Sequence, residues 1–139
     1  MPVQRTEIVI ETKRQGLHLI TREVSDALAR FQNTGPGLLH IFIKHTSASL
    51  LIQENASPSA RTDLDEFINR LAPENQAWHR HVDEGPDDTV SHMKAALTPT
   101  SLTIPVNGTR LEMGTWQGIY LWEHRRDSHR RKLVLTLLW

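Results

Sequence analysis

Apolar residues recur at helical spacing in two parts of the chain. The first part predicts an amphipathic helix from Thr21, as N-cap, to Phe31, stopped by the Gly35-Pro36-Gly37 turn. The second begins after Ser57-Pro58, a capping serine followed by a proline in the first turn, and ends at Pro73. The positions expected to face the core are Val24, Ala27, Leu28 and Phe31 in the first helix, and Leu64, Phe67, Ile68 and Leu71 in the second.

Shorter apolar stretches, several of them alternating, predict strands between these helices and after them. The expected strands cover residues 3–11, 38–44, 49–53, 101–106, 110–113, 119–124 and 132–139. Asn107-Gly108 is a hairpin signal between two of them. A short helix is expected from Asp88, as N-cap, through Leu97 to Pro99. The sequence therefore predicts an α+β fold of mostly antiparallel sheet, with two longer helices and one short helix.

The last predicted strand has apolar residues on both of its faces. Leu133, Leu135 and Leu137 alternate with Val134 and Leu138. A helix of the same chain could cover one face and a neighbouring subunit the other, which favours a homo-oligomer. A central strand within a single subunit is the alternative.

The composition narrows the functional classes. A chain of 139 residues that is 38% hydrophobic and 23% charged fits one domain, residues 1–139. Sixteen basic residues balance 16 acidic ones, so the broad basic surface expected of nucleic-acid or membrane binding is missing. The absence of cysteine excludes disulfides and thiolate ligands. No apolar signal or membrane-spanning run is present, and a cytoplasmic location is expected.

The chain has eight histidines, and several lie in or next to predicted loops. His92 lies one helical turn after Asp88, and His81 approaches the same turn across the Glu84–Asp87 segment. Imidazoles beside carboxylates are typical of a metal site. Because there is no H-E-x-x-H motif, such a site must be assembled from separate segments. A capped helix beside a solvated acidic loop is the alternative.

Three further segments are candidates for substrate binding. The His45–Ser49 segment places hydroxyl groups at the end of a strand, where they can bind phosphate. The Gly114–Gly118 segment can form a pocket wall in which Trp116 stacks on a ring and Gln117 binds its edge, or else a tight connection. The basic run from Arg125 to Lys132 would attract a phosphate group, although a solvated loop is the alternative.

Taken together, these motifs resemble the YjbQ-like family over nearly the whole chain. The matching motifs are His-Thr-Ser-Ala-Ser-Leu from His45, Glu54-Asn55, His-x-x-Glu-Gly-Pro-Asp-Asp from His81, Ser-His-Met-Lys from Ser91, and the segment from Gly114 to Arg125. The resemblance implies a compact single-domain α+β subunit, a homotrimer, and thiamine-phosphate synthase activity at a histidine-lined metal site. One departure is Thr89-Val90, where the family has Met-Pro, which is expected to shift the start of the short helix.

The resemblance also assigns roles by position. The metal ligands it implies are His45, His81, His92 and His124. We assign catalysis to Glu84, Asp88 and His92, and substrate binding to Thr46, Ser47, Asn55, Trp116, Gln117 and Arg125. Imidazole ligands favour Zn²⁺, whereas diphosphate chemistry usually employs Mg²⁺.

The expected reaction joins a pyrimidine diphosphate to a thiazole phosphate and releases pyrophosphate. A cation on the leaving group would assist it, with Arg125 on phosphate oxygens. Two alternatives stay open. One is a metal-dependent hydrolase of a small phosphorylated substrate, with Glu84 or Asp88 as base. The other is a trimeric protein that binds metal or a small ligand without catalysis.

Overall fold

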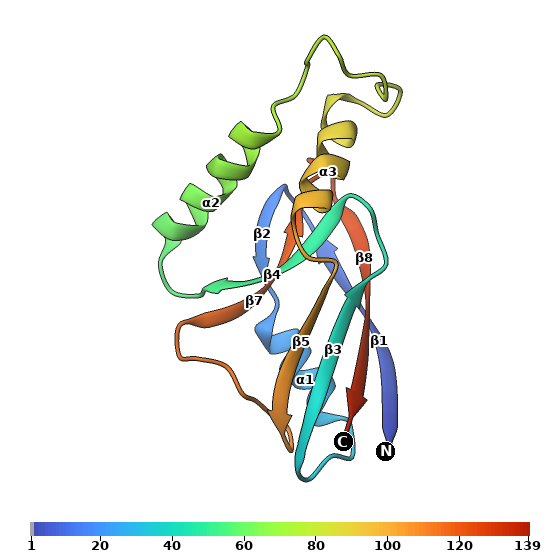
Figure 1. Ribbon diagram of the computed structural model, residues 1–139, viewed down its shortest axis with the longest axis vertical. Coiled ribbons are helices and arrows are strands. Elements are labelled where there is room, and N and C mark those ends of the chain that lie inside the picture. Colours follow the sequence, from blue (N-terminus) through green and yellow to red (C-terminus); the bar gives the residue numbers. More distant parts are fainter. Residues whose placement is uncertain (1) are drawn as a thin grey trace.

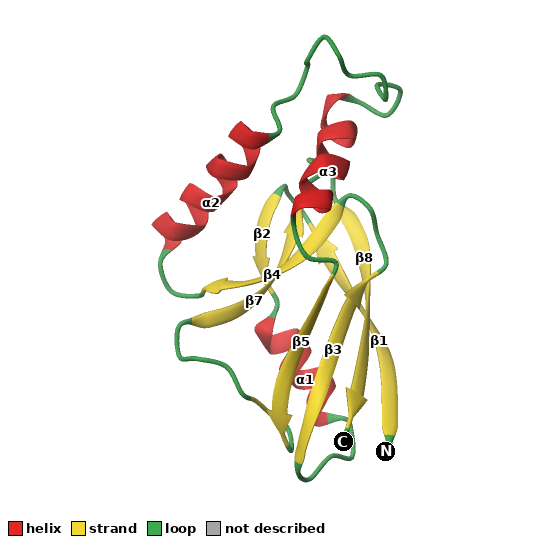
Figure 2. Cartoon of the chain, in the orientation of Figure 1, coloured by secondary structure: helices red, strands yellow, loops and turns green. Residues whose placement is uncertain are grey.

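Two antiparallel sheets organise the chain. The computed structural model describes residues 2–139, which form eight strands and three helices. In chain order these are β1 (Val3–Thr12), β2 (Gly16–Leu19), α1 (Thr21–Ala29), β3 (Pro36–Ile43), β4 (Ala48–Glu54), α2 (Pro58–Leu71), α3 (Pro86–Leu97), β5 (Ser101–Asn107), β6 (Arg110–Leu111), β7 (Gln117–Glu123) and β8 (His129–Leu138). One sheet has the order β1-β8-β3-β5-β6 and the other β2-β7-β4. The predicted α+β fold is confirmed (Figure 2).

Strand β8 lies inside the five-stranded sheet, where it pairs with β1 on one side and β3 on the other. Its inward residues Leu133, Leu135 and Leu137 are completely buried. They pack in one core with α1 and with residues of both sheets. Its alternate residues Val134 and Leu138 point to the outer face and are only half-buried. The two apolar faces predicted for this strand therefore have different environments.

Helix α1 lies at the predicted position, but Thr21 is not its N-cap. Ile20 is the cap residue and makes no side-chain capping bond. The Thr21 hydroxyl instead accepts a hydrogen bond of 2.9 Å from the backbone N–H of Ile119 in β7. The helix start is thus attached to the three-stranded sheet, which also includes β2, a strand that the sequence analysis did not predict.

Helix α2 is capped by Ser57 as predicted, with its hydroxyl accepting from the Ala60 N–H. The predicted burial of its apolar stripe was wrong. Only Ile68 is fully buried, whereas Phe67 and Leu71 are 57% and 54% exposed. Figure 1 shows the reason, because α2 stands to one side of the sheets. The apolar side chains of α2 pack on a small cluster around Leu17 and Trp122 of the three-stranded sheet. This narrow contact covers one line of side chains on the helix.

Helix α3 begins at Pro86, so that its N-cap lies three residues before the predicted one. Gly85 is the N-cap residue, with a φ of +96° that favours glycine, and proline is well suited to the first helical position. Asp88 is therefore not the cap. It lies in the first turn with its side chain buried, and Thr89-Val90 continues the helix without interruption. This start leaves the Asp88 carboxylate available to other partners.

The remaining connections follow the sequence signals. The β5–β6 hairpin turns at Gly108, whose φ is +60°. Between residues 2 and 139 no helix combines the length and the hydropathy that a bilayer crossing requires.

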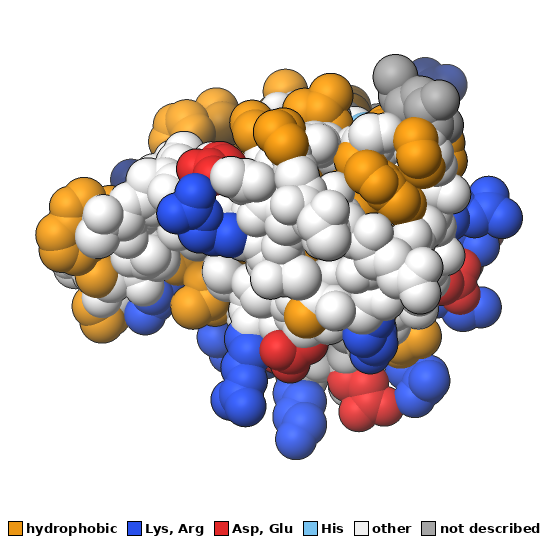
Figure 3. Space-filling model, turned by 90° about the horizontal axis from the view of Figure 1, so that it is seen from below, with side chains coloured by type: hydrophobic (Ala, Val, Ile, Leu, Met, Phe, Trp, Pro, Cys, Tyr) orange, Lys and Arg blue, Asp and Glu red, His pale blue; other side chains and the backbone are white. Residues whose placement is uncertain are grey.

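We expect the outer face of the five-stranded sheet to be the contact between copies of this chain. Leu38 and Phe42 are 47% and 44% exposed on it, and hydrophobic side chains gather along the upper border of the view from below (Figure 3). The intact chain should elute as a trimer in size-exclusion chromatography with light scattering. Phe42→Glu should give smaller species, because a carboxylate in an apolar contact is costly to desolvate.

Arg22→Ala is the matched control, since this exposed residue lies on α1, which packs against the inner face of the sheet, and it should leave the trimer unchanged. A monomeric parent chain, or a Phe42→Glu variant that stays trimeric, would contradict this assignment.

Candidate functional site

Two imidazoles and one carboxylate converge at the first turns of α3. Asp88 and His92 lie four residues apart, so both project from one side of the helix, and His81 reaches them from the preceding loop. The Oδ2 of Asp88 is 2.7 Å from His81 Nε2 and 3.1 Å from His92 Nε2. The three ligand atoms all lie within 4.8 Å of one another. We call this group the His81–Asp88–His92 cluster.

The hydrogen bond made by His92 Nδ1 determines whether Nε2 carries a proton. Its Nδ1 lies 2.9 Å from the backbone oxygen of Thr46. Because a carbonyl oxygen only accepts, Nδ1 must carry a proton and donate it, which leaves a lone pair on Nε2 in the neutral ring. That lone pair faces the Asp88 carboxylate. Two acceptors 3.1 Å apart need a cation between them, either a proton or a metal ion. The donor set therefore fits a metal ion.

Arg125 holds the Asp88 carboxylate from the opposite side. Its Nη1 donates to Asp88 Oδ1 at 2.7 Å and its Nε to Asp87 Oδ2 at 3.0 Å. Its Nη2 donates to the backbone oxygen of Glu84 at 3.0 Å. With Oδ1 engaged in this way, Oδ2 of Asp88 is the oxygen that faces the imidazoles.

Both aspartates are ionised at neutral pH. Burial by itself would raise the pKa of Asp88, but hydrogen bonding to His81 and the charge of Arg125 lower it overall. Burial would likewise raise the pKa of Asp87, and the backbone N–H of Arg126 and the Arg125 guanidinium outweigh it, so that this pKa is lowered too. The cluster thus keeps a permanent negative charge beside its imidazoles.

His45 and His124, the other two predicted ligands, lie outside the cluster. His124 is 1% exposed, and its Nε2 lies 3.0 Å from the Ser49 hydroxyl. Burial, followed by the charge of Lys94, lowers the pKa of His124 to about 3. His45 Nε2 accepts a 2.7 Å hydrogen bond from the Lys132 backbone N–H, and burial and then Arg131 lower its pKa. Both rings are neutral groups engaged with the surrounding fold.

The other predicted catalytic residue, Glu84, lies at the edge of the cluster. Its Oε2 is 3.4 Å from His81 Nε2, and its side chain is 62% exposed. A solvent-accessible carboxylate in this position can accept a proton from a reacting molecule.

The predicted substrate-binding residues divide between two places. Thr46 adjoins the cluster through its carbonyl, and the buried Ser47 hydroxyl accepts from Arg131 at 3.0 Å. Asn55, Trp116 and Gln117 lie instead at the opposite end of β7 from Arg125, a separation of about 20 Å along a seven-residue strand.

The Gly114–Gly118 segment forms a hydrogen-bonded turn in this structure. The Asn55 side chain donates to the backbone oxygens of Thr115 and Gln117, each at 3.1 Å, and the Gln117 side chain accepts from Gly114 N–H at 2.8 Å. Trp116 is 65% exposed. Within one chain, these side chains shape the turn before β7 and do not approach the cluster.

Sequence reasoning missed two buried charged groups near the site. Lys94 on α3 is 2% exposed, and its Nζ donates to Asn69 Oδ1 at 2.5 Å. Glu123 is completely buried and forms an ion pair with Arg131. The sequence signals for Lys94 are its place in the motif that begins at Ser91 and its seven-residue spacing from Asp87, which puts both residues on the inner side of α3.

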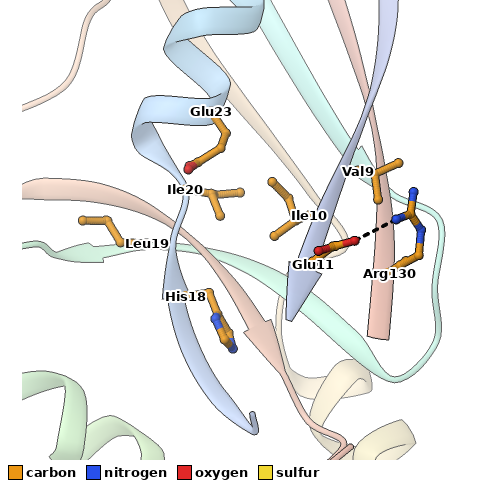
Figure 4. Close-up of a pocket in the computed structure, with 8 residues that line it drawn as sticks. All are labelled: Val9, Ile10, Glu11, His18, Leu19, Ile20, Glu23 and Arg130. Carbon is orange, nitrogen blue, oxygen red and sulfur yellow. Dashed lines mark hydrogen bonds and ion pairs between the residues drawn. The ribbon is translucent and has the colours of Figure 1, made fainter. Parts of the chain in front are cut away.

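Two of the hollows in the surface adjoin the cluster and another does not. One of about 460 Å³ is lined by His81 and one of about 520 Å³ by His92. A third, of about 450 Å³, lies between β1 and the segment from β2 to α1, with Ile10 and Ile20 in its wall (Figure 4). A Glu11–Arg130 ion pair of 2.7 Å borders it, and it contains no residue of the cluster.

Known proteins to which this chain is similar in sequence carry the same family description. Residues 6–139 match the family described as UPF0047 protein YjbQ-like. The chain is 44% identical to UPF0047 protein YjbQ of Salmonella typhimurium over 134 residues, which cover 96% of each protein. It is also 44% identical to UPF0047 protein sll1880 of Synechocystis over 128 residues, 92% of this chain and 86% of that protein.

Solved structures agree with this relationship. The conserved hypothetical protein TT1486 of Thermus thermophilus superposes with a TM-score of 0.85 at 32% identity, covering 96% of this chain and 99% of that one. The hypothetical protein APE1520 of Aeropyrum pernix gives a TM-score of 0.85 at 27% identity, with 97% and 98% coverage.

Arg125→Met should lower the free energy of unfolding by about 3 kcal/mol, because it leaves Asp87 and Asp88 buried without their cation. Urea unfolding measures the change. Arg130→Met is the matched control, since Arg130 pairs with Glu11 on the surface, and it should cost about 0–1 kcal/mol. Equal losses in the two variants would show that the Arg125 contacts contribute no more than a surface pair.

The stability of the protein should fall between pH 7.5 and 5, in part because of His124. The unfolded imidazole titrates near 6.5 and the folded one at about 3, so its contribution is complete above pH 6.5 and is lost as the pH falls toward 3. Urea unfolding at both pH values should give a smaller difference for His124→Asn than for the parent chain. Identical differences would mean that His124 accepts a proton in the folded state as readily as in the unfolded state.

Proposed function

Because this chain belongs to the YjbQ-like UPF0047 family and gathers two imidazoles and a carboxylate at the start of α3, we propose that it is a metal-dependent enzyme. The ligands are His81, Asp88 and His92. The observation that carries the proposal is the lone pair of His92 Nε2, which faces an ionised carboxylate oxygen at 3.1 Å.

Zn²⁺ is the proposed ion. Two imidazole nitrogens and one carboxylate oxygen are the kind of three-ligand set that catalytic zinc uses, with a further position left for substrate. Mg²⁺ is the alternative that diphosphate chemistry would favour, but it binds mainly through oxygen ligands. When bound, the ion would act as a Lewis acid on an oxygen of the substrate.

The specific reaction we propose is of the thiamine-phosphate synthase type, in which a pyrimidine diphosphate is joined to a thiazole phosphate and pyrophosphate leaves. The family resemblance supports this reaction. The chain would bind the substrate next to the cluster, with Thr46 beside it. Arg125 would act indirectly, since its guanidinium is already bound to Asp87 and Asp88.

A metal-dependent hydrolase of a small phosphorylated substrate is the second candidate. The position of Glu84 favours it, because an exposed carboxylate 3.4 Å from His81 can take a proton from an attacking water. Arg125 is already paired with Asp87 and Asp88, and this also favours the hydrolase. Hydrolysis of a single phosphate group needs fewer cations than release of pyrophosphate.

Metal-free protein should bind Zn²⁺ in isothermal titration calorimetry with one site per chain. His81→Ala and His92→Ala should each weaken binding by roughly a hundredfold or more, because each removes one of three ligands. His18→Ala should leave the affinity unchanged, since the His18 ring binds the backbone oxygen of Arg14, remote from the cluster in the chain. Equal affinity in all four proteins would refute the assigned ligands.

Product analysis on the Zn²⁺-loaded protein separates the candidate functions. Thiamine phosphate and pyrophosphate formed from the two precursors, and lost in His92→Ala, support the synthase. Phosphate release from p-nitrophenyl phosphate without synthesis supports the hydrolase. Zn²⁺ binding with neither product indicates a protein that binds metal without catalysis.

A further inference from the structure

The hollow beside His92 differs in chemistry from the hollow beside His81. Its wall is formed by His45, Thr46, His92, Ala95, Ala96 and Thr100. Ala95 and Ala96 follow His92 by three and four residues, so their methyl groups lie one helical turn along α3 from the cluster. Because His92 belongs to the cluster and to this wall, a molecule in the hollow would touch a proposed metal ligand.

Within the described part of the chain, residues 2–139, no permanently charged side chain lines this hollow. The one titratable group besides His92 among its lining residues is His45, whose Nε2 accepts a hydrogen bond from the Lys132 backbone N–H and therefore carries no proton. The Thr46 carbonyl is already bound to His92 Nδ1. The surface that remains consists of methyl groups and two threonine side chains, which suits an uncharged, largely apolar group.

The hollow beside His81 has a more polar wall. It includes the amide side chains of Asn75 and Gln76, and also His79. The Nε2 of His79 is buried and makes no hydrogen bond within residues 2–139. An apolar group placed against this wall would take the exposed Asn75 amide out of water, which is unfavourable.

We propose that the hollow beside His92 binds the apolar part of the substrate, an aromatic or branched aliphatic group, while an anionic group of the same molecule lies at the cluster. This inference rests on the proposed function, because the anionic group needs a bound metal ion as its anchor. The substrate class it defines is a compact apolar group joined to a phosphate-like head. The two alanines make the hollow, since any larger side chain in their place would occupy it.

The test compares phenylphosphonate with methylphosphonate, which share a head group and differ in apolar surface. On Zn²⁺-loaded protein, calorimetry should show phenylphosphonate binding about tenfold more tightly, from burial of part of its ring. Ala96→Leu should abolish this preference by filling the hollow, while Zn²⁺ affinity stays the same. Ala96 is exposed, so the fold should tolerate the change.

Ala77→Leu is the matched control, because Ala77 is exposed and lines the hollow beside His81. It should preserve the tenfold preference. Failure of the parent chain to bind Zn²⁺ would overturn the proposed function and this inference together. Zn²⁺ binding with equal affinity for the two phosphonates would overturn this inference alone, and so would a preference removed by Ala77→Leu and kept by Ala96→Leu.

Discussion

The site depends on one guanidinium group. Asp87 and Asp88 are adjacent, ionised and buried in the first turn of α3, an arrangement in which the two carboxylates repel each other and lose solvation. Arg125, two residues beyond the end of β7, binds both of them and also the Glu84 carbonyl. The helix N-terminus adds a favourable field for negative charge. This interaction joins the three-stranded sheet to α3 and directs one Asp88 oxygen toward the imidazoles.

The residues that surround Arg125 in the chain are similarly committed to the fold. Glu123 is buried against Arg131, with the Thr12 hydroxyl donating to it at 2.6 Å. His124 is a neutral ring beside Ser49, because burial makes its protonated form costly. The basic run from Arg125 to Lys132, which in the sequence suggests phosphate binding, thus contains residues with two different roles. Its buried members satisfy internal carboxylates, and Arg130, which pairs with Glu11, is a surface residue.

The parts of this fold that follow from local rules could be predicted. The start of α2 at Ser57-Pro58 and the Asp88 to His92 spacing depend only on neighbours in sequence. The exposure of Phe67 could not be predicted, because it depends on how much of α2 the sheet covers. The hydrogen bond of His45 could not be predicted either, because its donor is the backbone N–H of Lys132 in β8, a strand far away in the sequence. Periodicity identifies an apolar stripe or an imidazole but not the group that packs against it.

The hydrogen bond from His92 to the Thr46 carbonyl links the fold to the proposed chemistry. It fixes a proton on Nδ1, so any second proton on the ring must go to Nε2, the atom that faces Asp88. In the absence of a metal ion, that second proton would give an imidazolium paired with the carboxylate. A metal ion would replace it, because ligand atoms must be deprotonated to bind. Protons and the proposed metal ion would therefore compete for the same position, which the hydrogen bond to the Thr46 carbonyl makes available.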